Sequence, residues 1–300
     1  MKPSFVAPML TGAVLSAMVV PSFANTIQRI RDSGVITVAH RESSVPFSYF
    51  DANKQPIGYA VDLCLKVVDA IKRELRLPNL KVSYLMVTPS TRIPAIKDGK
   101  ADIECGSTTN TKERRKDVEF TIPHFFAGAR MIVKTSANIK NWDDLRGKSV
   151  VTTKGTTNVK SLAAKNEERV LNAKLVEGKD HAESFGMVVE GKAVAFAMDD
   201  VLLYGFRASA ADPNGYAVVG DLLTIEPYAM IVSKTDAEFK KMVDREMARL
   251  IVDNEIQPIY KKWFQSPVAT KETGKTINMN MPMSYLLRDS FKYPTDKIPD

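Results

Sequence analysis

Small hydroxyl residues and an arginine stand close together in residues 105–115. Three hydroxyl residues, 107–109, directly follow a strand-like segment at residues 101–104, and Arg114 comes a few residues later. Hydroxyl and backbone N–H donors beside a turn, with a guanidinium that forms a bidentate pair, suit a carboxylate ligand. The structural alternative is a hydroxyl cap of a helix that carries a solvated basic face.

The elements around this run predict a parallel sheet covered by helices. The pattern is strand, helix, strand, helix, strand, over residues 35–40, 60–77, 81–87, 93–98 and 101–104. Ligands of such sheets bind at the carboxyl ends of the strands. Arg41, Arg92, Ser107 and Thr109 all follow predicted strands closely, so we expect them to lie together.

A second α/β unit is enclosed by the first. We expect its strands and helices at residues 130–134, 149–153, 158–168, 175–177, 182–190, 193–198 and 201–208. A strand at 230–233, a helix with a capping box that starts at Thr235, and a helix that carries Trp263 return the chain to the first unit. The chain therefore crosses between the units near residues 129–134 and 226–232, which predicts a two-strand hinge beside a cleft. Of the adjacent Asp199 and Asp200, we expect one to cap the next helix and Asp199 to face the cleft.

The first 24 residues predict a secretory signal peptide. Lys2 precedes a mostly apolar stretch, and small residues, Ser22 and Ala24, stand at the two positions that a signal peptidase reads. A transmembrane anchor is the alternative, but the stretch is short and broken by Pro8 and Pro21. No cysteine stands near the cleavage position, so we expect export to a Gram-negative periplasm. The net charge of +7 is dispersed and not interleaved with aromatic residues, so we expect no nucleic-acid partner.

Cys64 and Cys105 are the only cysteines. An exported chain permits a disulfide between them. Cys64 lies on the apolar stripe of a predicted helix and Cys105 at a strand end, and we interpret them as two separate buried thiols. No spacing of histidines and cysteines suits a metal, and we expect no cofactor.

Several segments in their order resemble a known family. The chain is similar to the periplasmic solute-binding proteins of polar amino-acid ABC transporters, and within them to the glutamate/aspartate-binding proteins. The matching segments are residues 40–49, 92–94, 104–110, 155–157, 179–181 and 195–200. The resemblance implies a two-lobed type II periplasmic-binding-protein fold, each lobe a mostly parallel sheet flanked by helices. Its parts would be residues 25–130 with 231–265, residues 131–230, and a tail at 266–300 that packs on the first lobe.

The resemblance also implies roles for individual residues. Arg114 would hold the α-carboxylate of the ligand, helped by Ser107, Thr109, Thr156 and Thr157. Asp199 would accept the α-ammonium group, and Arg41, Arg92 and His181 would face the side-chain carboxylate. The chain departs from the family at Pro89, which has neither a hydroxyl nor an N–H, so the donor in that segment is Thr88 or Ser90.

These roles imply a monomeric binding protein, not an enzyme, that captures L-glutamate or L-aspartate and delivers it to an ABC permease. Three arginines and one aspartate complement two carboxylates and one ammonium group. The sequence leaves the choice between glutamate and aspartate open. One alternative is a dehydratase of cyclic dicarboxylates on the same scaffold, for which His181 or Glu42 would be the general acid. A sensory ligand-binding domain is the other.

Overall fold

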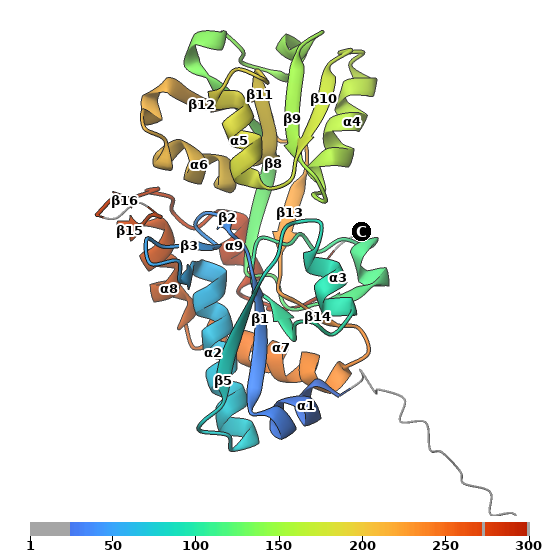
Figure 1. Ribbon diagram of the computed structural model, residues 1–300, viewed down its shortest axis with the longest axis vertical. Helices are drawn as coiled ribbons and strands as arrows, with labels where there is room; N and C mark the ends of the chain where they lie inside the picture. The colour runs from blue at the N-terminus through green and yellow to red at the C-terminus, as the bar shows by residue number, and fades with distance from the viewer. Residues whose placement is uncertain (1–24, 272–273, 299–300) are drawn as a thin grey trace, which may run out of the picture.

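Two α/β lobes lie one above the other and are joined by two strands (Figure 1). The computed structural model describes residues 25–271 and 274–298, and the predicted signal peptide lies outside the described residues. In the described part of the chain, no helix combines the length and the apolar character needed to cross a membrane.

The first lobe is built on a five-stranded sheet. Its strands are β1 (Val35–His40), β5 (Lys81–Met86), β6 (Ile103–Glu104), β7 (Val118–Phe120) and β14 (Ile231–Ser233). Their order is β5-β1-β6-β14-β7, with β1 parallel to β5 and β6, and β14 antiparallel to β6 and β7. The carboxyl ends of β1, β5 and β6 therefore meet at one edge, which faces the second lobe (Figure 1).

Helices and a small sheet complete this lobe. The helices are α1 (Thr26–Ser33), α2 (Tyr59–Leu75), α3 (Arg92–Lys97), α7 (Ala237–Val252) and α8 (Ile256–Phe264). The small sheet consists of β2 (Ser43–Ser44), β3 (Ser48–Phe50) and β4 (Pro56–Ile57). The predicted capping box of α7 is wrong in its position, because Asp236 and not Thr235 is the N-cap and accepts a 3.0 Å hydrogen bond from the Phe239 N–H. The Asp236 carboxylate also accepts from the Thr26 N–H, so it joins the starts of α7 and α1.

The second lobe has a parallel group of strands next to the strand that enters it. Its strands are β8 (Phe125–Lys134), β9 (Ser149–Thr153), β10 (Lys174–Gly178), β11 (Ala195–Asp199) and β12 (Tyr216–Val219). The order is β10-β9-β11-β8-β12, with β9 parallel to β10 and β11. Its helices are α4 (Asn158–Glu168), α5 (His181–Val189) and α6 (Asp200–Ser209).

The hinge is one long strand paired with a short one. The first residues of β8 pair with β13 (Ile225–Tyr228), and its later residues pair with β11 and β12 in the second lobe. The strand starts earlier than the expected residue 130, and the chain crosses near residues 125–128. The reason is packing: Phe125 is buried, and its ring lies 5.0 Å from that of Phe47 and 5.1 Å from that of Phe264. Phe47 and Trp263 are also buried in the core.

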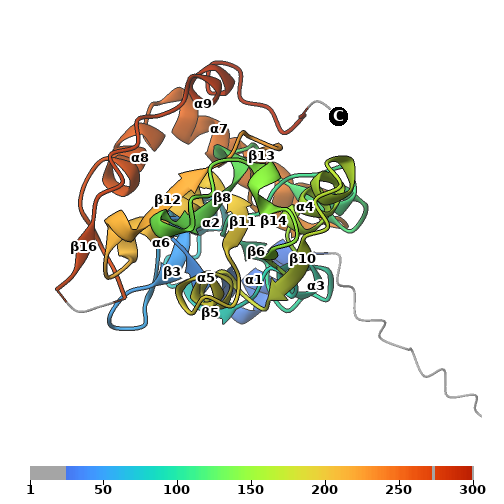
Figure 2. The same cartoon turned by 90° about the horizontal axis from the view of Figure 1, so that it is seen from above.

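The segment after residue 265 contacts both lobes along the outside of the molecule (Figure 2). It contains β15 (Val268–Ala269), β16 (Thr276–Ile277) and α9 (Tyr285–Ser290). On the first lobe, Tyr49 donates a 2.7 Å hydrogen bond to the Ala269 carbonyl, and Lys240 pairs with Asp296 at 2.7 Å. On the second lobe, Lys275 donates to the Ser209 carbonyl at 3.3 Å.

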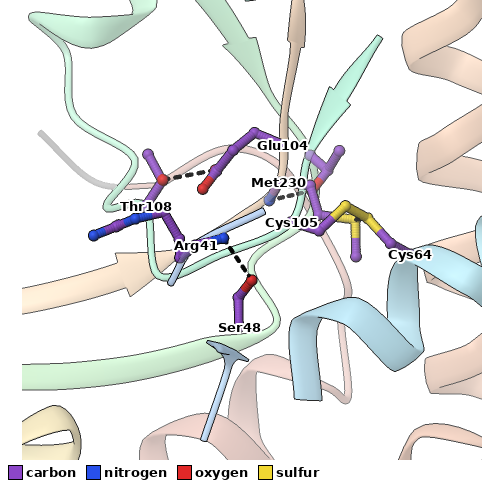
Figure 3. Close-up of a disulfide and its surroundings, with 8 residues drawn as sticks. Arg41, Ser48, Cys64, Glu104, Cys105, Thr108 and Met230 are labelled. Carbon is purple, nitrogen blue, oxygen red and sulfur yellow. Dashed lines mark hydrogen bonds between the residues drawn. A yellow bond between two sulfur atoms is a disulfide. The ribbon is translucent and has the colours of Figure 1, made fainter. Parts of the chain in front are cut away.

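Cys64 and Cys105 form a disulfide (Figure 3). Their Cα atoms are 6.2 Å apart, within the range that the bond requires. The interpretation as two separate thiols is wrong. The sequence pattern of each element gives no information on how α2 and β6 pack together. In the structure the helix packs on the sheet, so the buried face of α2 meets the end of β6. The bond thereby anchors the start of the hydroxyl run to the core.

Candidate functional site

The hydroxyl run lies along the hinge and is not a helix cap. Only a three-residue 3-10 turn, Arg114–Lys116, follows it, so the structural alternative is wrong. Thr108 accepts a 3.0 Å hydrogen bond from the Ala229 N–H, and Asn110 donates to the Pro227 carbonyl at 2.8 Å. Arg114 donates to the Thr109 carbonyl at 2.9 Å and, across the cleft, to the Gly155 carbonyl at 3.1 Å. The Arg114 guanidinium is therefore held between the lobes.

Arg41, directly after β1, and Arg92, the first residue of α3, are buried close to each other. They are 1% and 2% exposed. The Arg41 N–H donates to Ser48 Oγ at 2.8 Å, and Arg92 donates from Nη1 to the Ser107 carbonyl at 3.3 Å. Burial lowers the pKa of Arg41, and Arg92 lowers it further, yet a guanidinium remains protonated at neutral pH. Two positive charges are thus held together away from water.

Several polar atoms of these two arginines and of Ser107 lack a hydrogen-bond partner. Arg41 Nε and Nη1, Arg92 Nε and Ser107 Oγ are buried and have no hydrogen-bond partner among the described residues. Buried donors in folded proteins are nearly always paired. This concentration of unpaired donors at one point therefore indicates a place where an anion binds.

His181 reaches Arg41 from the second lobe. It is the first residue of α5, after the N-cap Asp180, so the helix begins one residue earlier than the expected residue 182. Its Nε2 lies 3.3 Å from Arg41 Nη2, and its Nδ1 lies 3.0 Å from Thr153 Oγ1. Because arginine only donates, Nε2 must accept, which leaves the proton on Nδ1. Burial and the charges of Arg41 and Arg92 lower the pKa of His181 well below its usual value, so the ring is neutral at pH 7.

Asp199 faces the cleft at the end of β11, while Asp200 serves the start of α6. Asp200 Oδ1 accepts hydrogen bonds from the N–H of Val201 at 2.7 Å and of Gly128 at 3.2 Å. Asp199 Oδ1 accepts from Asn158 Nδ2 at 2.7 Å, and its other oxygen accepts from the Tyr228 hydroxyl. Burial raises the pKa of Asp199 to about 7, and the nearby carboxylate of Glu226 contributes to this rise.

The loop after β9 supplies the remaining expected residues. The Thr156 hydroxyl donates to the Thr153 carbonyl at 2.7 Å, and the Thr157 hydroxyl donates to Glu226 Oε2 at 2.8 Å. Both hydroxyl protons are therefore used within the chain. Thr156 and Thr157 line a groove of about 600 Å³ together with Thr109, Arg114 and Glu226.

Three carboxylates lie near the three arginines of this cleft and act on them electrostatically. Besides Asp199, they are Glu104 at the end of β6 and Glu226 on β13, both buried. Sequence analysis missed Glu104, Glu226, Tyr228 and Asn158. A signal was present for Glu226 and Tyr228: two residues apart on a strand, they point to the same side. The sequence does not show that this side faces the arginines, because that depends on the position of the strand in the hinge.

The chain is similar to known proteins over most of its length. Residues 36–266 match the model of a protein family described as "Bacterial extracellular solute-binding proteins, family 3". The chain is 46% identical over 297 residues to a Pseudomonas aeruginosa protein named L-glutamate/L-aspartate-binding protein, which covers 98% of this chain and 97% of that protein. It is 40% identical over 277 residues to an Escherichia coli protein named glutamate/aspartate import solute-binding protein, with coverage of 92% and 90%.

Solved structures have the same architecture. An arginine-binding protein from T. maritima superposes with a TM-score of 0.70 at 24% identity, over 80% of this chain and 99% of that one. An ancestral amino-acid-binding protein, described as a precursor of cyclohexadienyl dehydratase, superposes with a TM-score of 0.68 at 30% identity, over 79% and 99%.

The fold is thus that of the two-lobed amino-acid-binding proteins of type II. The chain belongs to the bacterial extracellular solute-binding proteins, family 3.

Proposed function

We propose that this protein captures L-glutamate or L-aspartate between its lobes and delivers it to a membrane ABC permease. The observation that carries the proposal is the group of unpaired donors on Arg41, Arg92 and Ser107, which faces His181 and Asp199 of the opposite lobe. A ligand that bridges both lobes binds the closed state better than the open state and so favours closure. The named activities of the Pseudomonas and Escherichia relatives support the same ligands.

Each part of the ligand has a proposed partner. Arg114 binds the α-carboxylate, with help from Ser107, Thr109 and the 156–157 loop. Asp199 binds the α-ammonium group. Arg41 and Arg92 bind the side-chain carboxylate, while His181 accepts from Arg41 and keeps that guanidinium turned toward the ligand.

The preference for an acidic side chain follows from desolvation. Arg41 and Arg92 are already removed from water, so a neutral amide in place of the carboxylate leaves their charges uncompensated. A site built around buried ionic groups rejects an uncharged analogue strongly, because the groups of the protein are then left unpaired. L-Glutamine should therefore bind far more weakly than L-glutamate.

The remaining proposals concern organisation and location. We propose lobes at residues 25–130 with 231–265 and at 131–230, and a tail at 266–300 that packs on the first lobe and makes a further contact from Lys275 to Ser209 of the second lobe. Cleavage of the 24-residue signal peptide would release the chain as a monomer into the periplasm. We propose no catalytic role, since His181 has both ring nitrogens engaged by Arg41 and Thr153 and is not poised as a general acid.

The test is calorimetric titration of refolded, ligand-free protein with L-glutamate, L-aspartate and L-glutamine. We expect tight binding of one or both acids, with the amide weaker by at least about 100-fold. Preference for the amide, or no binding of any of the three, would overturn the proposal. Incubation with prephenate or arogenate, followed for aromatic products, tests the dehydratase alternative on the same sample.

Closure of the cleft should depend on Gly155. Its φ of +79° favours glycine, and an added Cβ would lie 2.7 Å from Ser90 Cα across the cleft. We expect Gly155→Ala to hold the lobes apart and weaken L-glutamate binding by about tenfold, since about 1.4 kcal/mol corresponds to that factor. Small-angle X-ray scattering with saturating L-glutamate would show a larger radius than for the wild type.

Gly147→Ala is the matched control for this prediction. Gly147 has a similar φ of +70° but no atom within 4 Å of an added Cβ. Its replacement by alanine therefore introduces the same backbone strain without a steric clash across the cleft. Equal affinities of the two variants would contradict the steric explanation.

A further inference from the structure

Glu104 is a buried carboxylate behind the Arg41 and Arg92 pair. It ends β6, pairs in register with Ala39 of β1, and has no exposed surface. Its Oε2 accepts a 2.7 Å hydrogen bond from the Thr108 hydroxyl, and its Oε1 has no hydrogen-bond partner among the described residues (Figure 3). Burying a carboxylate costs free energy unless other groups stabilise its charge, and a single hydroxyl donor provides only a small part of that stabilisation.

The remaining stabilisation of the Glu104 charge is electrostatic and comes from Arg41 and Arg92, without a direct hydrogen bond to either. A Cβ added at Gly106 would lie 2.3 Å from Glu104 Oε1 and 2.9 Å from Arg41 Cγ, so the carboxylate and the aliphatic part of Arg41 meet over this glycine. The charge of Glu104 raises the pKa of Arg41 and of Arg92, opposing the effect of their burial. Because Arg41 Nε and Nη1 remain unpaired, the carboxylate offsets the positive charge and leaves the donors available.

We propose that Glu104 is a built-in counter-charge that partly neutralises the Arg41–Arg92 pair and thereby limits the affinity for acidic ligands. It is a positioning and affinity-setting residue and does not touch the ligand. This inference rests on the proposed function, in which Arg41 and Arg92 bind the side-chain carboxylate.

As a consequence, Glu104 should raise the stability of the ligand-free protein and lower its affinity for an acidic ligand. Without the ligand, Glu104 reduces the repulsion between two buried guanidinium groups of the first lobe and so stabilises the folded state of that lobe. With the ligand bound, Glu104 repels the incoming carboxylate, because both negative charges lie close to the same pair of arginines in a medium of low dielectric constant. A binding protein that must release its ligand to a permease benefits from this limit on affinity.

The test replaces the charge and keeps the shape. Glu104→Gln retains an oxygen that accepts from Thr108, and Glu104→Asp retains the charge. For Glu104→Gln we expect a ligand-free melting temperature about 5 °C below wild type and L-glutamate affinity about tenfold tighter. L-Glutamine, whose side chain is uncharged, should change by less than about threefold. Glu104→Asp should stay near wild type in affinity.

The measurements are calorimetry and thermal unfolding with and without ligand. Weaker or unchanged L-glutamate binding by Glu104→Gln would overturn the inference, since loss of packing lowers stability and affinity together. If the variant does not fold alone, refolding with saturating L-glutamate should rescue it, because the ligand supplies the missing negative charge; failure of that rescue also overturns the inference. Failure of the wild-type protein to bind L-glutamate would instead overturn the proposed function.

Discussion

Replacing Arg114 with alanine should weaken L-glutamate binding by at least about 30-fold. The proposed bond to the α-carboxylate is charge-assisted and partly desolvated, and removing one partner of such a pair costs about 2 kcal/mol or more. The side chain also joins the Thr109 carbonyl in one lobe to the Gly155 carbonyl in the other, so its loss removes a contact of the closed state. Calorimetric titration of the variant measures the effect directly.

Arg115→Ala is the matched control for this prediction. Arg115 carries the same charge one residue later, but its guanidinium bonds Asn110 within the same lobe at 2.7 Å. We expect its affinity for L-glutamate to remain within about threefold of wild type, as is usual for a change away from a site. Unchanged binding by Arg114→Ala would mean that the α-carboxylate is held elsewhere.

Affinity for L-glutamate should fall as the solution becomes acidic. The proposed partner of the α-ammonium group is the Asp199 carboxylate, whose pKa is raised to about 7 chiefly by burial. Only the ionised form attracts an ammonium group, so binding is strongest near pH 8, where the α-ammonium group of the ligand is still protonated, and is lost as pH falls through 7. At pH 5.5 a group with this pKa is only about 3% ionised, so we expect affinity roughly 30-fold below that at pH 8.

Glu226→Gln is the informative companion variant. Glu226 is the neighbouring carboxylate that contributes to the raised pKa of Asp199, so its neutralisation should move the loss of binding to lower pH. Asp199→Asn should bind weakly at every pH and lose the dependence. A flat profile of the wild type between pH 5.5 and 8 would exclude Asp199 as the titrating partner of the ligand.

Local patterns were sufficient for the order of the elements. The predicted strands at residues 35–40 and 149–153 and the predicted helix at 158–168 have the observed bounds. These elements carry strong periodicity and definite ends, and their order limits an α/β chain to few topologies. Together with the segments shared with a family, this order was enough to predict two lobes and to place Arg41, Arg92 and Asp199 near the carboxyl ends of strands.

Only the tertiary structure decided the partners of these residues. The disulfide between Cys64 and Cys105 and the contact between His181 and Arg41 join positions far apart in the chain, and no local pattern encodes such distances. The same holds for Glu104 and Glu226, which look like ordinary charged residues until the sheet and the hinge bury them beside the arginines. The sequence by itself determined which groups end the strands, because periodicity is local. Burial and charge balance in the cleft depend on how the two lobes meet.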